Sequence, residues 1–440
     1  MESKKVNVVT MGCPKNIVDS EILLKQLQSA GYIITHDDYE TSSDIVIINT
    51  CGFINDAKEE SIDMILKFAD AKKRGLISRL YVIGCLSQKY PNELKKEIPE
   101  VDQFFGVNSI KPLLSELGSR TKEDLLIDRI LTGPAHYAYL KISDGCNRSC
   151  AFCSIPCIRG KHISKSIETI LREASVLEKK GVKELILVAQ DLNYYGIDIY
   201  RKRMLGTLIK KIAAENSFEW IRLQYLYPTG LSESLLYNIK DNNKICKYID
   251  IPLQHITDRM LKKMKRGYSK RYVEKLITRI KEIMPDAVIR TTLITGHPGE
   301  TSEDFIALRD FVKEFQFDRL GVFKYSHEEG TYAGINYTDD IPDEEKEARA
   351  SEIMEIQQKI SLKKNMLKVG STFKVLIDRN EGGYFIGRTE YDSPDVDQEV
   401  LIEDKYDLHP GLFYNIKITS AAEFDLYGIP YEMWPSNSGD

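Results

Sequence analysis

The stretch SDGCNRSCAFC, residues 143–153, decides the interpretation of this chain because it brings three cysteines close together. These are Cys146, Cys150 and Cys153, in the spacing CxxxCxxC, and we call them the barrel trio. Soft thiolate ligands at short spacing are typical of zinc sites and iron–sulfur clusters. A thiolate site normally has four ligands, and no obvious fourth cysteine completes the set. The motif therefore predicts a metal site with one position left for another group.

The motif follows a predicted strand, YAYLKI at 137–142, which opens a series of six strands separated by helical patterns. The other five candidate strands are ELILVAQ (184–190), WIRLQY (220–225), YIDIPL (248–253), AVIRTTLI (287–294) and RLGVFKY (319–325). Six βα repeats are too few for an eight-fold barrel, so we expect an open, partial (β/α)6 barrel. In such barrels the loops after the strands form the active face, and the barrel trio lies in one of these loops.

The chain before this barrel also alternates short β-rich runs with amphipathic helical patterns. The runs are VNVVT (6–10), DIVIINT (44–50) and RLYVIG (79–84). This alternation predicts an α/β domain over residues 1–125, with a doubly wound parallel sheet and helices on both faces. A polar segment around 119–134 is expected to be a linker. We expect the barrel domain to span residues 132–368 and to end in a long charged helix at about 342–368.

After Gly370 the hydrophobic pattern changes to alternation with a period of two. The runs that show it are FKVLID, YFIGRTE, EVLIED and FYNIKIT, with turns at EGG and HPG. This pattern predicts a small all-β domain over residues 370–437, and we expect a five-stranded barrel.

Three further cysteines, Cys13, Cys51 and Cys85, each stand just past the end of a predicted strand of the first domain. We call them the sheet trio. The carboxyl ends of the strands in a doubly wound parallel sheet line one crevice, so thiols far apart in sequence can converge there. Ordinary burial of three cysteines is the alternative. Their shared position favours a second thiolate site with an open position.

Other interpretations of the cysteines are weaker. A zinc site usually pairs two CxxC knuckles, and the nearest histidine, His162, lies in a basic loop. Disulfides are disfavoured in a cytosolic protein. Cys157 as a fourth ligand would close the barrel site and suit it only to electron transfer, and we expect it instead to be a small buried thiol. Cys246 begins a strand and is expected in the core.

Composition and charge narrow the class of protein. The chain has 440 residues, 42% hydrophobic and 29% charged, which is enough for two or three globular domains. Its first residues, MESKKVNVVTMGC, contain no apolar stretch long enough for a signal peptide, and no segment reaches about 18 apolar residues, so we expect a soluble cytoplasmic protein with no membrane partner. Residues 370–440 contain 14 acidic and five basic residues, a charge of −9, which leaves +4 on the rest. Such a domain repels phosphate backbones and attracts basic proteins, unless its acidic face is merely solvated.

Several motifs accompany the cysteines. They are MGCPKNIVDSE (11–21), NTCGFI (49–54), VAQDLNYYGID (188–198), KYIDIPLQH (247–255), TGHPGET (295–301) and GVFKYSHEEGTYA (321–333). From Val6 to about Gly428 the chain resembles the radical S-adenosylmethionine methylthiotransferases. The resemblance implies a flavodoxin-like domain, a partial radical barrel and a C-terminal TRAM domain. One departure is His297, where the family often has Phe.

The resemblance also implies two 4Fe–4S clusters. The cluster on the barrel trio would bind S-adenosylmethionine, which makes Cys146, Cys150 and Cys153 the catalytic cysteines, and the sheet trio would hold an auxiliary cluster that receives external sulfur. Phe152 would pack near the adenine, although a core aromatic is an equal alternative. Gln190 and Thr292 stand at strand ends that face the same mouth, so we expect cofactor contacts there.

Within this family the motifs resemble the branch that modifies an aspartate of ribosomal protein S-twelve, a basic protein that the acidic TRAM domain would attract. The implied reaction replaces a C–H bond at the aspartate β-carbon by C–S–CH₃ and needs an electron donor and a sulfur source. We expect a monomer with no direct tRNA substrate. The rival branch modifies an adenosine of tRNA. The non-enzymatic rival is a ribosome-associated binding module that holds zinc. Arg159 and Lys161 either meet a carboxylate of cofactor or substrate or belong to a solvated basic loop.

Overall fold

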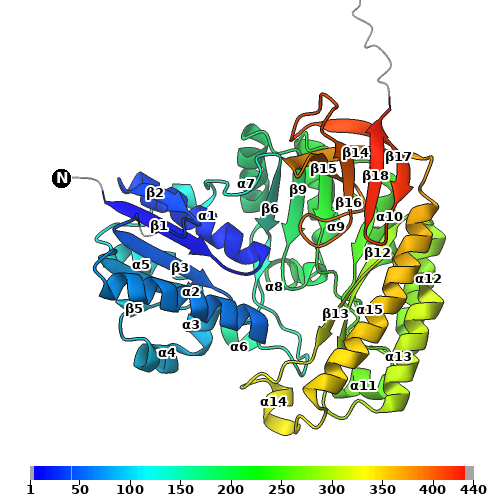
Figure 1. Ribbon diagram of the computed structural model, residues 1–440, viewed down its shortest axis with the longest axis horizontal. Helices are drawn as coiled ribbons and strands as arrows, with labels where there is room; N and C mark the ends of the chain where they lie inside the picture. Colours follow the sequence, from blue (N-terminus) through cyan, green and yellow to red (C-terminus); the bar gives the residue numbers. More distant parts are fainter. Residues whose placement is uncertain (1–3, 41, 432–440) are drawn as a thin grey trace, which may run out of the picture.

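The computed structural model describes residues 4–40 and 42–431, and its first unit is a five-stranded parallel sheet (Figure 1). The strands are β1 (Lys5–Thr10), β2 (Ile33–His36), β3 (Ile45–Thr50), β4 (Arg79–Gly84) and β5 (Gln103–Phe104). Their order, β2-β1-β3-β4-β5, is the flavodoxin-like order of doubly wound sheets. The sequence pattern predicted the three central strands and missed β2 and β5 at the edges.

Helices cover both faces of this sheet. They are α1 (Pro14–Ser29), α2 (Asn55–Lys73), α3 (Cys85–Lys89), α4 (Pro91–Glu97) and α5 (Ile110–Glu116). Leu24 of α1 and Leu113 of α5 lie in one apolar cluster, and Phe68 of α2 lies in another on the opposite face. The prediction of a doubly wound α/β unit is therefore confirmed.

The second unit is an arc of six parallel strands, and all six were predicted. They are β6 (Tyr137–Lys141), β9 (Glu184–Val188), β10 (Trp220–Leu223), β11 (Tyr248–Asp250), β12 (Val288–Thr295) and β13 (Arg319–Lys324). They form two three-stranded sheets, β10-β9-β6 and β11-β12-β13, which meet where Cys246 N–H donates to the carbonyl of Ile221 at 3.0 Å. In the part of the chain that the structure describes, no ladder joins β6 to β13, so the barrel is open.

Six long helices cover the outer face of this arc. They are α7 (Ile167–Lys179), α9 (Leu205–Glu215), α10 (Glu233–Asp241), α12 (Lys270–Ile283), α13 (Ser302–Phe315) and α15 (Asp343–Met366). In α12, Val273, Leu276, Ile277 and Ile280 follow helical spacing and are buried, which fixes the face that packs on the strands. Shorter elements shape the loops: β7 (Ser143–Asp144), α6 (Ile155–Arg159), β8 (Ile163–Ser164), α8 (Ile197–Tyr200), α11 (Asp258–Lys263), α14 (Tyr332–Asn336) and the 3₁₀ turns Glu123–Leu126 and Leu192–Tyr194.

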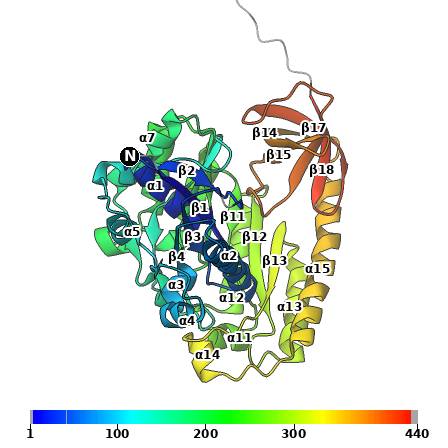
Figure 2. The same ribbon diagram turned by 60° about the vertical axis from the view of Figure 1, so that its left-hand side comes forward.

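The third unit is a closed five-stranded barrel, as predicted. Its strands are β14 (Thr372–Glu381), β15 (Tyr384–Thr389), β16 (Glu399–Glu403), β17 (Phe413–Ala421) and β18 (Asp425–Pro430), in the order β14-β15-β16-β18-β17. The helix α15 runs along the edge of the arc and carries the chain to this small barrel (Figure 2). No helix within the described residues is both long and apolar enough to cross a membrane.

The helix α1 of the first unit lies against the inner face of the arc. Leu185 and Leu187 of β9 belong to the core under the outer helices, so Ile186 points the other way. Ile186 packs with Val18 and Ile22 of α1. Because α1 begins directly after Cys13, this packing brings the sheet trio to the mouth of the barrel.

The segment 119–134, which was predicted to be a linker, is held to α1. The side chain of Gln26 donates to the carbonyl of Lys122 and accepts from its N–H, both at 2.9 Å. Thr132 N–H donates to Glu21 Oε1 at 3.0 Å. The connection between the first two units is therefore ordered along α1.

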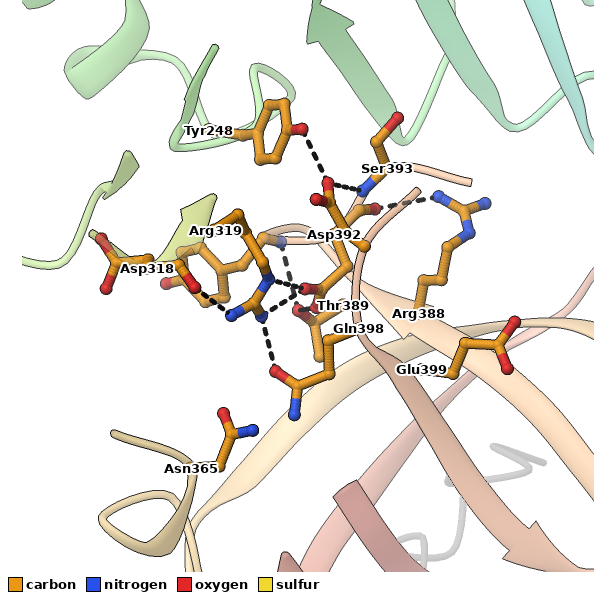
Figure 3. A network of polar contacts seen from close by, with 12 residues as sticks. Tyr248, Asp318, Arg319, Asn365, Arg388, Thr389, Asp392, Ser393, Gln398 and Glu399 are labelled. Carbon is orange, nitrogen blue, oxygen red and sulfur yellow. Dashed lines mark hydrogen bonds and ion pairs between the residues drawn. The ribbon is translucent and has the colours of Figure 1, made fainter. Parts of the chain in front are cut away.

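Polar contacts fasten the small barrel to the amino ends of the arc strands (Figure 3). Arg319 of β13 donates through Nε to Asp392 at 3.0 Å and through Nη2 to Gln398 at 2.5 Å. The hydroxyl of Tyr248 donates to Asp397 at 2.7 Å. A cavity of about 290 Å³ lies at this junction, lined partly by Arg319 and Gln398. It lies at the opposite ends of the strands from the two cysteine trios.

Candidate functional site: two cysteine trios at the domain junction

The structure brings the sheet trio together at one edge of the first sheet. Cys13 precedes α1, Cys51 follows β3 directly, and Cys85 begins α3, so they come from three neighbouring strands. Burial raises the pKa of the Cys51 thiol to about 11, and the nearby thiols of Cys13 and Cys85 add to the rise. The three sulfur atoms are therefore close enough to influence one another electrostatically, as the sequence predicted.

A glycine makes this convergence possible. Gly12 has φ +89°, and a Cβ atom at this position would lie 2.6 Å from Cβ of Cys51. Any other residue would therefore be strained and would push the loop before Cys13 away from Cys51.

The barrel trio lies in the loop after β6, at the carboxyl ends of the arc strands. Burial raises the pKa of Cys153 to about 12, with the thiol of Cys150 as the next cause, and burial also raises the pKa of Cys146. The loop is closed by a hydrogen bond of 3.1 Å from Cys146 N–H to the carbonyl of Gly160. Gly145, with φ +72°, permits this approach, because a Cβ atom there would lie 2.2 Å from the carbonyl oxygen of Lys161.

The donor set of both trios is thiolate, which iron–sulfur clusters use. Within residues 4–40 and 42–431, no group of three or more His, Cys, Asp or Glu side chains is arranged to hold one metal ion. A zinc ion would need its ligands within about 2.3 Å of a single point. The thiolate donor set of each trio fits an iron–sulfur cluster.

The two remaining cysteines lie apart from these sites. Cys246 is 2% exposed, so the prediction that it belongs to the core is confirmed. Cys157 is exposed, and its thiol donates to the carbonyl of Gly330 at 3.6 Å. The prediction of a buried thiol at Cys157 is wrong, because the residue lies on the outward side of the short helix α6.

The structure places the three residues predicted to contact the cofactor around the barrel mouth. Phe152 is partly buried and packs in the apolar cluster that contains Ala151 and Ile294. Gln190 donates through Nε2 to Asp144 at 3.2 Å, while its buried Oε1 has no hydrogen-bond partner among the described residues. Thr292 faces the inside of the arc, since the next residue of β12 points into the helix-side core.

Gln254 is a site residue that sequence reasoning missed. Its N–H donates to the carbonyl of Thr292, and its own carbonyl accepts from Ile294 N–H, both at 2.8 Å. Its φ of +73° is unusual for a residue other than glycine, and its buried Oε1 has no partner within the described chain. The unpartnered oxygens of Gln190 and Gln254 can accept hydrogen bonds from the ammonium and hydroxyl groups of a ligand such as S-adenosylmethionine. Gln254 lies in the motif KYIDIPLQH, but nothing in that motif indicates its role, because Gln carries no preference for this backbone conformation.

A buried charge network lies between the two trios. Arg159 donates to Asp144 at 3.0 Å and to Oδ1 of Asn16 in α1 at 2.7 Å, and Lys141 also reaches Asp144 at 3.1 Å. Burial raises the pKa of Asp144, but Lys141 and Arg159 outweigh this and hold it well below its usual range. Burial likewise raises the pKa of Cys85, which the Arg159 guanidinium opposes. Arg159 is therefore no part of a solvated loop, whereas Lys161 is exposed.

A second arginine, Arg266, contacts the barrel trio directly. Its Nη1 donates to Sγ of Cys150 at 3.0 Å.

On the far side of the mouth, Glu328 follows β13 and forms salt bridges with two lysines of the first unit. Lys58 lies at 3.0 Å and Lys89 at 2.5 Å. The two lysine contacts hold α2 and α3 of the first unit against the loop after β13.

Known protein families match all three units. Residues 5–106 match "Uncharacterized protein family UPF0004", residues 140–312 match the Radical SAM superfamily, and residues 369–430 match the TRAM domain. Among solved structures, the radical S-adenosylmethionine methyltransferase TsrM from Kitasatospora setae has a TM-score of 0.55 at 15% identity and covers 76% of this chain and 77% of its own. At this identity the likeness concerns the fold alone.

Curated relatives match over nearly the whole length. The ribosomal protein uS12 methylthiotransferase RimO of Flavobacterium psychrophilum is 52% identical over 98% of this chain and 99% of its own. The protein of the same name from Bacteroides thetaiotaomicron is 52% identical over 97% of this chain and 98% of its own. With this identity, the three matching units and the two cysteine trios, the chain belongs to the ribosomal protein uS12 methylthiotransferase family of radical S-adenosylmethionine enzymes.

Proposed function

We propose that this protein replaces a hydrogen at the β-carbon of an aspartate of ribosomal protein uS12 by a methylthio group. The names of its close relatives support the reaction and the substrate. The observation that carries the proposal is the meeting of two separate cysteine trios at one junction, linked through Arg159 and Asp144. Two such sites close together would suit a reaction that needs both a radical and a sulfur atom.

We assign the barrel trio to a 4Fe–4S cluster with S-adenosylmethionine, and the sheet trio to an auxiliary 4Fe–4S cluster. When bound, these groups supply a radical that can remove an unactivated hydrogen, the incoming sulfur and the methyl group. Gln190, Gln254 and Thr292 would orient S-adenosylmethionine through their oxygen atoms, and Phe152 would pack on its adenine. The electron donor and the sulfur source come from outside the chain.

The protein's own residues keep the two cysteine trios at fixed positions relative to each other. The helix α1 covers the inner face of β6 and β9 and so excludes water from this side of the interior of the open barrel. Lys15, the second residue of α1, lies with Nζ 3.9 Å above the ring of Tyr225 at the end of β10. Together with the hydrogen bond of 2.7 Å from Arg159 to Asn16 of α1, this contact holds the start of α1, and with it Cys13, against the mouth of the arc.

The acidic small barrel is proposed to meet the basic substrate protein, with less attraction than its charge of −9 suggests. The buried side chains of Asp392 and Asp397 pair with Arg319 and Arg290 of the arc, so two carboxylates of the small barrel are neutralised by cations from outside it. Exposed carboxylates with no lysine or arginine partner among the described residues remain at Asp395, Asp404 and Asp407. These would contact uS12 and disfavour tRNA.

We further propose a cytoplasmic monomer divided at residues 1–125, 132–368 and 370–437. The last helix of the first unit ends at Glu116, and the arc begins at Tyr137. The helix α15 ends at Met366, and the small barrel begins at Thr372. The outermost parts of this division, residues 1–3 and 432–437, lie outside the described residues.

Iron and sulfide analysis of anaerobically reconstituted protein tests the two-site assignment. We expect Cys13→Ala and Cys150→Ala each to lose half of the iron and sulfide and to keep the other half. Cys157→Ala is the matched control and should keep all of it, because this exposed thiol belongs to neither trio. A colourless protein that binds zinc instead would refute the assignment and support the binding module.

Mass spectrometry of uS12 and of bulk tRNA from cells that lack the gene tests the substrate. We expect the methylthio group to vanish from the aspartate of uS12 and to return when the gene is restored. Loss of methylthioadenosine from tRNA, with uS12 still modified, would overturn the choice of substrate.

A further inference from the structure

Arg266 is a buried cation that no step of the proposed function uses. It follows α11, is 4% exposed, and donates through Nη1 to Sγ of Cys150 at 3.0 Å. A guanidinium is always charged in proteins, so this is a permanent charge-assisted hydrogen bond to one sulfur of the barrel trio.

The remaining donors of Arg266 fix its position. Nε donates to the hydroxyl oxygen of Tyr268 at 2.9 Å, and Nη2 donates to the carbonyl of Pro252 at 2.5 Å. The hydroxyl of Tyr268 donates in turn to the carbonyl of Leu253 at 2.8 Å. Because three directions of the planar fork are engaged, the guanidinium is held in place beside Cys150.

The neighbouring arginine, Arg148, does not contact a sulfur of the barrel trio through its side chain. Tyr227 lies between two guanidinium groups, with Arg148 at 3.9 Å and Arg266 at 4.5 Å from its ring centre. The Arg148 side chain is directed to Asp191 at 2.9 Å, and only its backbone N–H reaches Sγ of Cys146, at 3.4 Å. Cys146 therefore has a neutral donor, whereas Cys150 has a charged one.

Hydrogen bonds to cluster sulfurs and burial are among the factors that set the potential of an iron–sulfur cluster. Reduction adds a negative charge to the cluster, and a nearby fixed cation stabilises the reduced form more than the oxidised form. The effect is strong in a buried site of low dielectric. We propose that Arg266 is a positioning residue that raises the reduction potential of the cluster on the barrel trio and so eases its one-electron reduction. This inference rests on the proposed function.

The test uses the full chain with Cys13, Cys51 and Cys85 all replaced by Ala, so that only the barrel cluster remains. Its midpoint potential is measured by redox titration followed by electron paramagnetic resonance, with iron content determined in parallel. In this background we expect Arg266→Gln to lower the potential, with about tenfold less reduced cluster at a fixed potential, equal to about 59 mV for one electron. Arg266→Lys keeps the charge but loses the fork, so a smaller shift in the same direction is expected.

Tyr268→Phe is the matched control in the same background. It removes one anchor of Arg266 but leaves Nη1 beside Cys150, so we expect a potential close to that of the parent. An unchanged potential in Arg266→Gln, or an equal shift in Tyr268→Phe, would overturn the inference. So would loss of iron in Arg266→Gln with no shift in Arg266→Lys, because that pattern indicates a role in assembly alone. A parent that binds no iron would instead overturn the proposed function.

Discussion

Glu184 and Arg222 form a salt bridge of 2.6 Å in which neither side chain is exposed. The same carboxylate receives Arg388 of the small barrel at 2.9 Å, and Arg222 also donates to the carbonyl of Glu390 at 2.7 Å. One buried carboxylate therefore forms salt bridges with two cations from two different units. Through these two contacts it stabilises both the arc and the attachment of the small barrel to it.

We expect Glu184→Gln to destabilise the protein by about 3–5 kcal/mol, because two buried guanidinium groups lose their shared counter-charge. The measurement is the shift of the urea midpoint. The control is Glu219→Gln, since Glu219 pairs with Lys374 at a half-exposed site and should cost less than about 1 kcal/mol. Equal shifts in the two variants would contradict the shared role of Glu184.

Glu328 should hold the first unit to the arc in a pH-dependent way. Burial raises its pKa, but hydrogen bonds from Lys89, Ser326 and Lys58 outweigh this, so its pKa lies below the ordinary 4.5. Its contribution is therefore fully present above pH 4.5 and is lost as the pH falls through the lowered folded pKa.

At neutral pH we expect Glu328→Gln to loosen the junction between these two units. Hydrogen exchange should become faster in α3 and in the loop after β13, because Lys89 loses its buried partner. Glu329→Gln, at the exposed neighbouring position, is the control and should leave both segments protected. Unchanged exchange in Glu328→Gln would refute the role of this contact.

His297 should make the protein sensitive to mild acid. It is completely buried, and burial lowers its pKa to about 4 from the ordinary 6.5. The unfolded chain takes up a proton as the pH falls below 6.5, whereas the folded protein does so only near pH 4. Stability therefore falls between these values, by on the order of 3 kcal/mol at 1.36 kcal/mol per pKa unit.

His297→Phe should remove this part of the acid sensitivity. A phenyl ring can keep the edge contacts with Tyr325 and Tyr337. The measurement is the difference between the urea midpoints at pH 7.5 and pH 5, in the variant and in the parent. An equal difference in both proteins would show that His297 is not the source.

Gln254 should contribute to the binding of S-adenosylmethionine. Loss of a hydrogen bond to a charged group costs about 1.5–3 kcal/mol, so Gln254→Ala should weaken binding by about 10- to 100-fold. The dissociation constant of S-adenosylmethionine, measured by equilibrium binding to the reconstituted variant and parent, checks this prediction. Gln357 also has an unpartnered buried oxygen within the described residues but lies on α15, where it donates to the carbonyl of Phe317. Gln357→Ala should therefore bind the cofactor normally, and equal weakening would contradict the assignment.

The long elements of the fold were predictable because their burial follows a simple period. Runs such as ELILVAQ and RLYVIG are continuous and apolar, as buried parallel strands require. The edge strands β2 and β5 were missed because β2 is only partly buried and β5 has two residues. Neither gives a pattern long enough to distinguish it from a loop.

The cysteines were also predictable, since each follows a strong strand signal, but the residues that support them were not. Arg266 stands in the basic run KKMKRGYSKR, which resembles a solvated segment. Its burial depends on Tyr227, which another part of the chain brings to it, as well as on Tyr268 of the same run. Arg159 was uncertain for the same reason. Tyr225 and Gln254 adopt positive φ values at strand ends, and the identity of neither residue indicates this.

The packing of α1 into the arc has a consequence for how the chain is made. Val18 and Ile22 lack their main cover until β6 and β9 have been synthesised, and each such side chain contributes about 1.5–3 kcal/mol when buried. An excised fragment that ends in the segment 119–134 would expose these apolar side chains to water and would tend to aggregate. During translation, between 54 and 69 further residues must be added after the end of such a fragment before Val188 is reached, so we expect a chaperone to bind the amino-terminal part in the meantime.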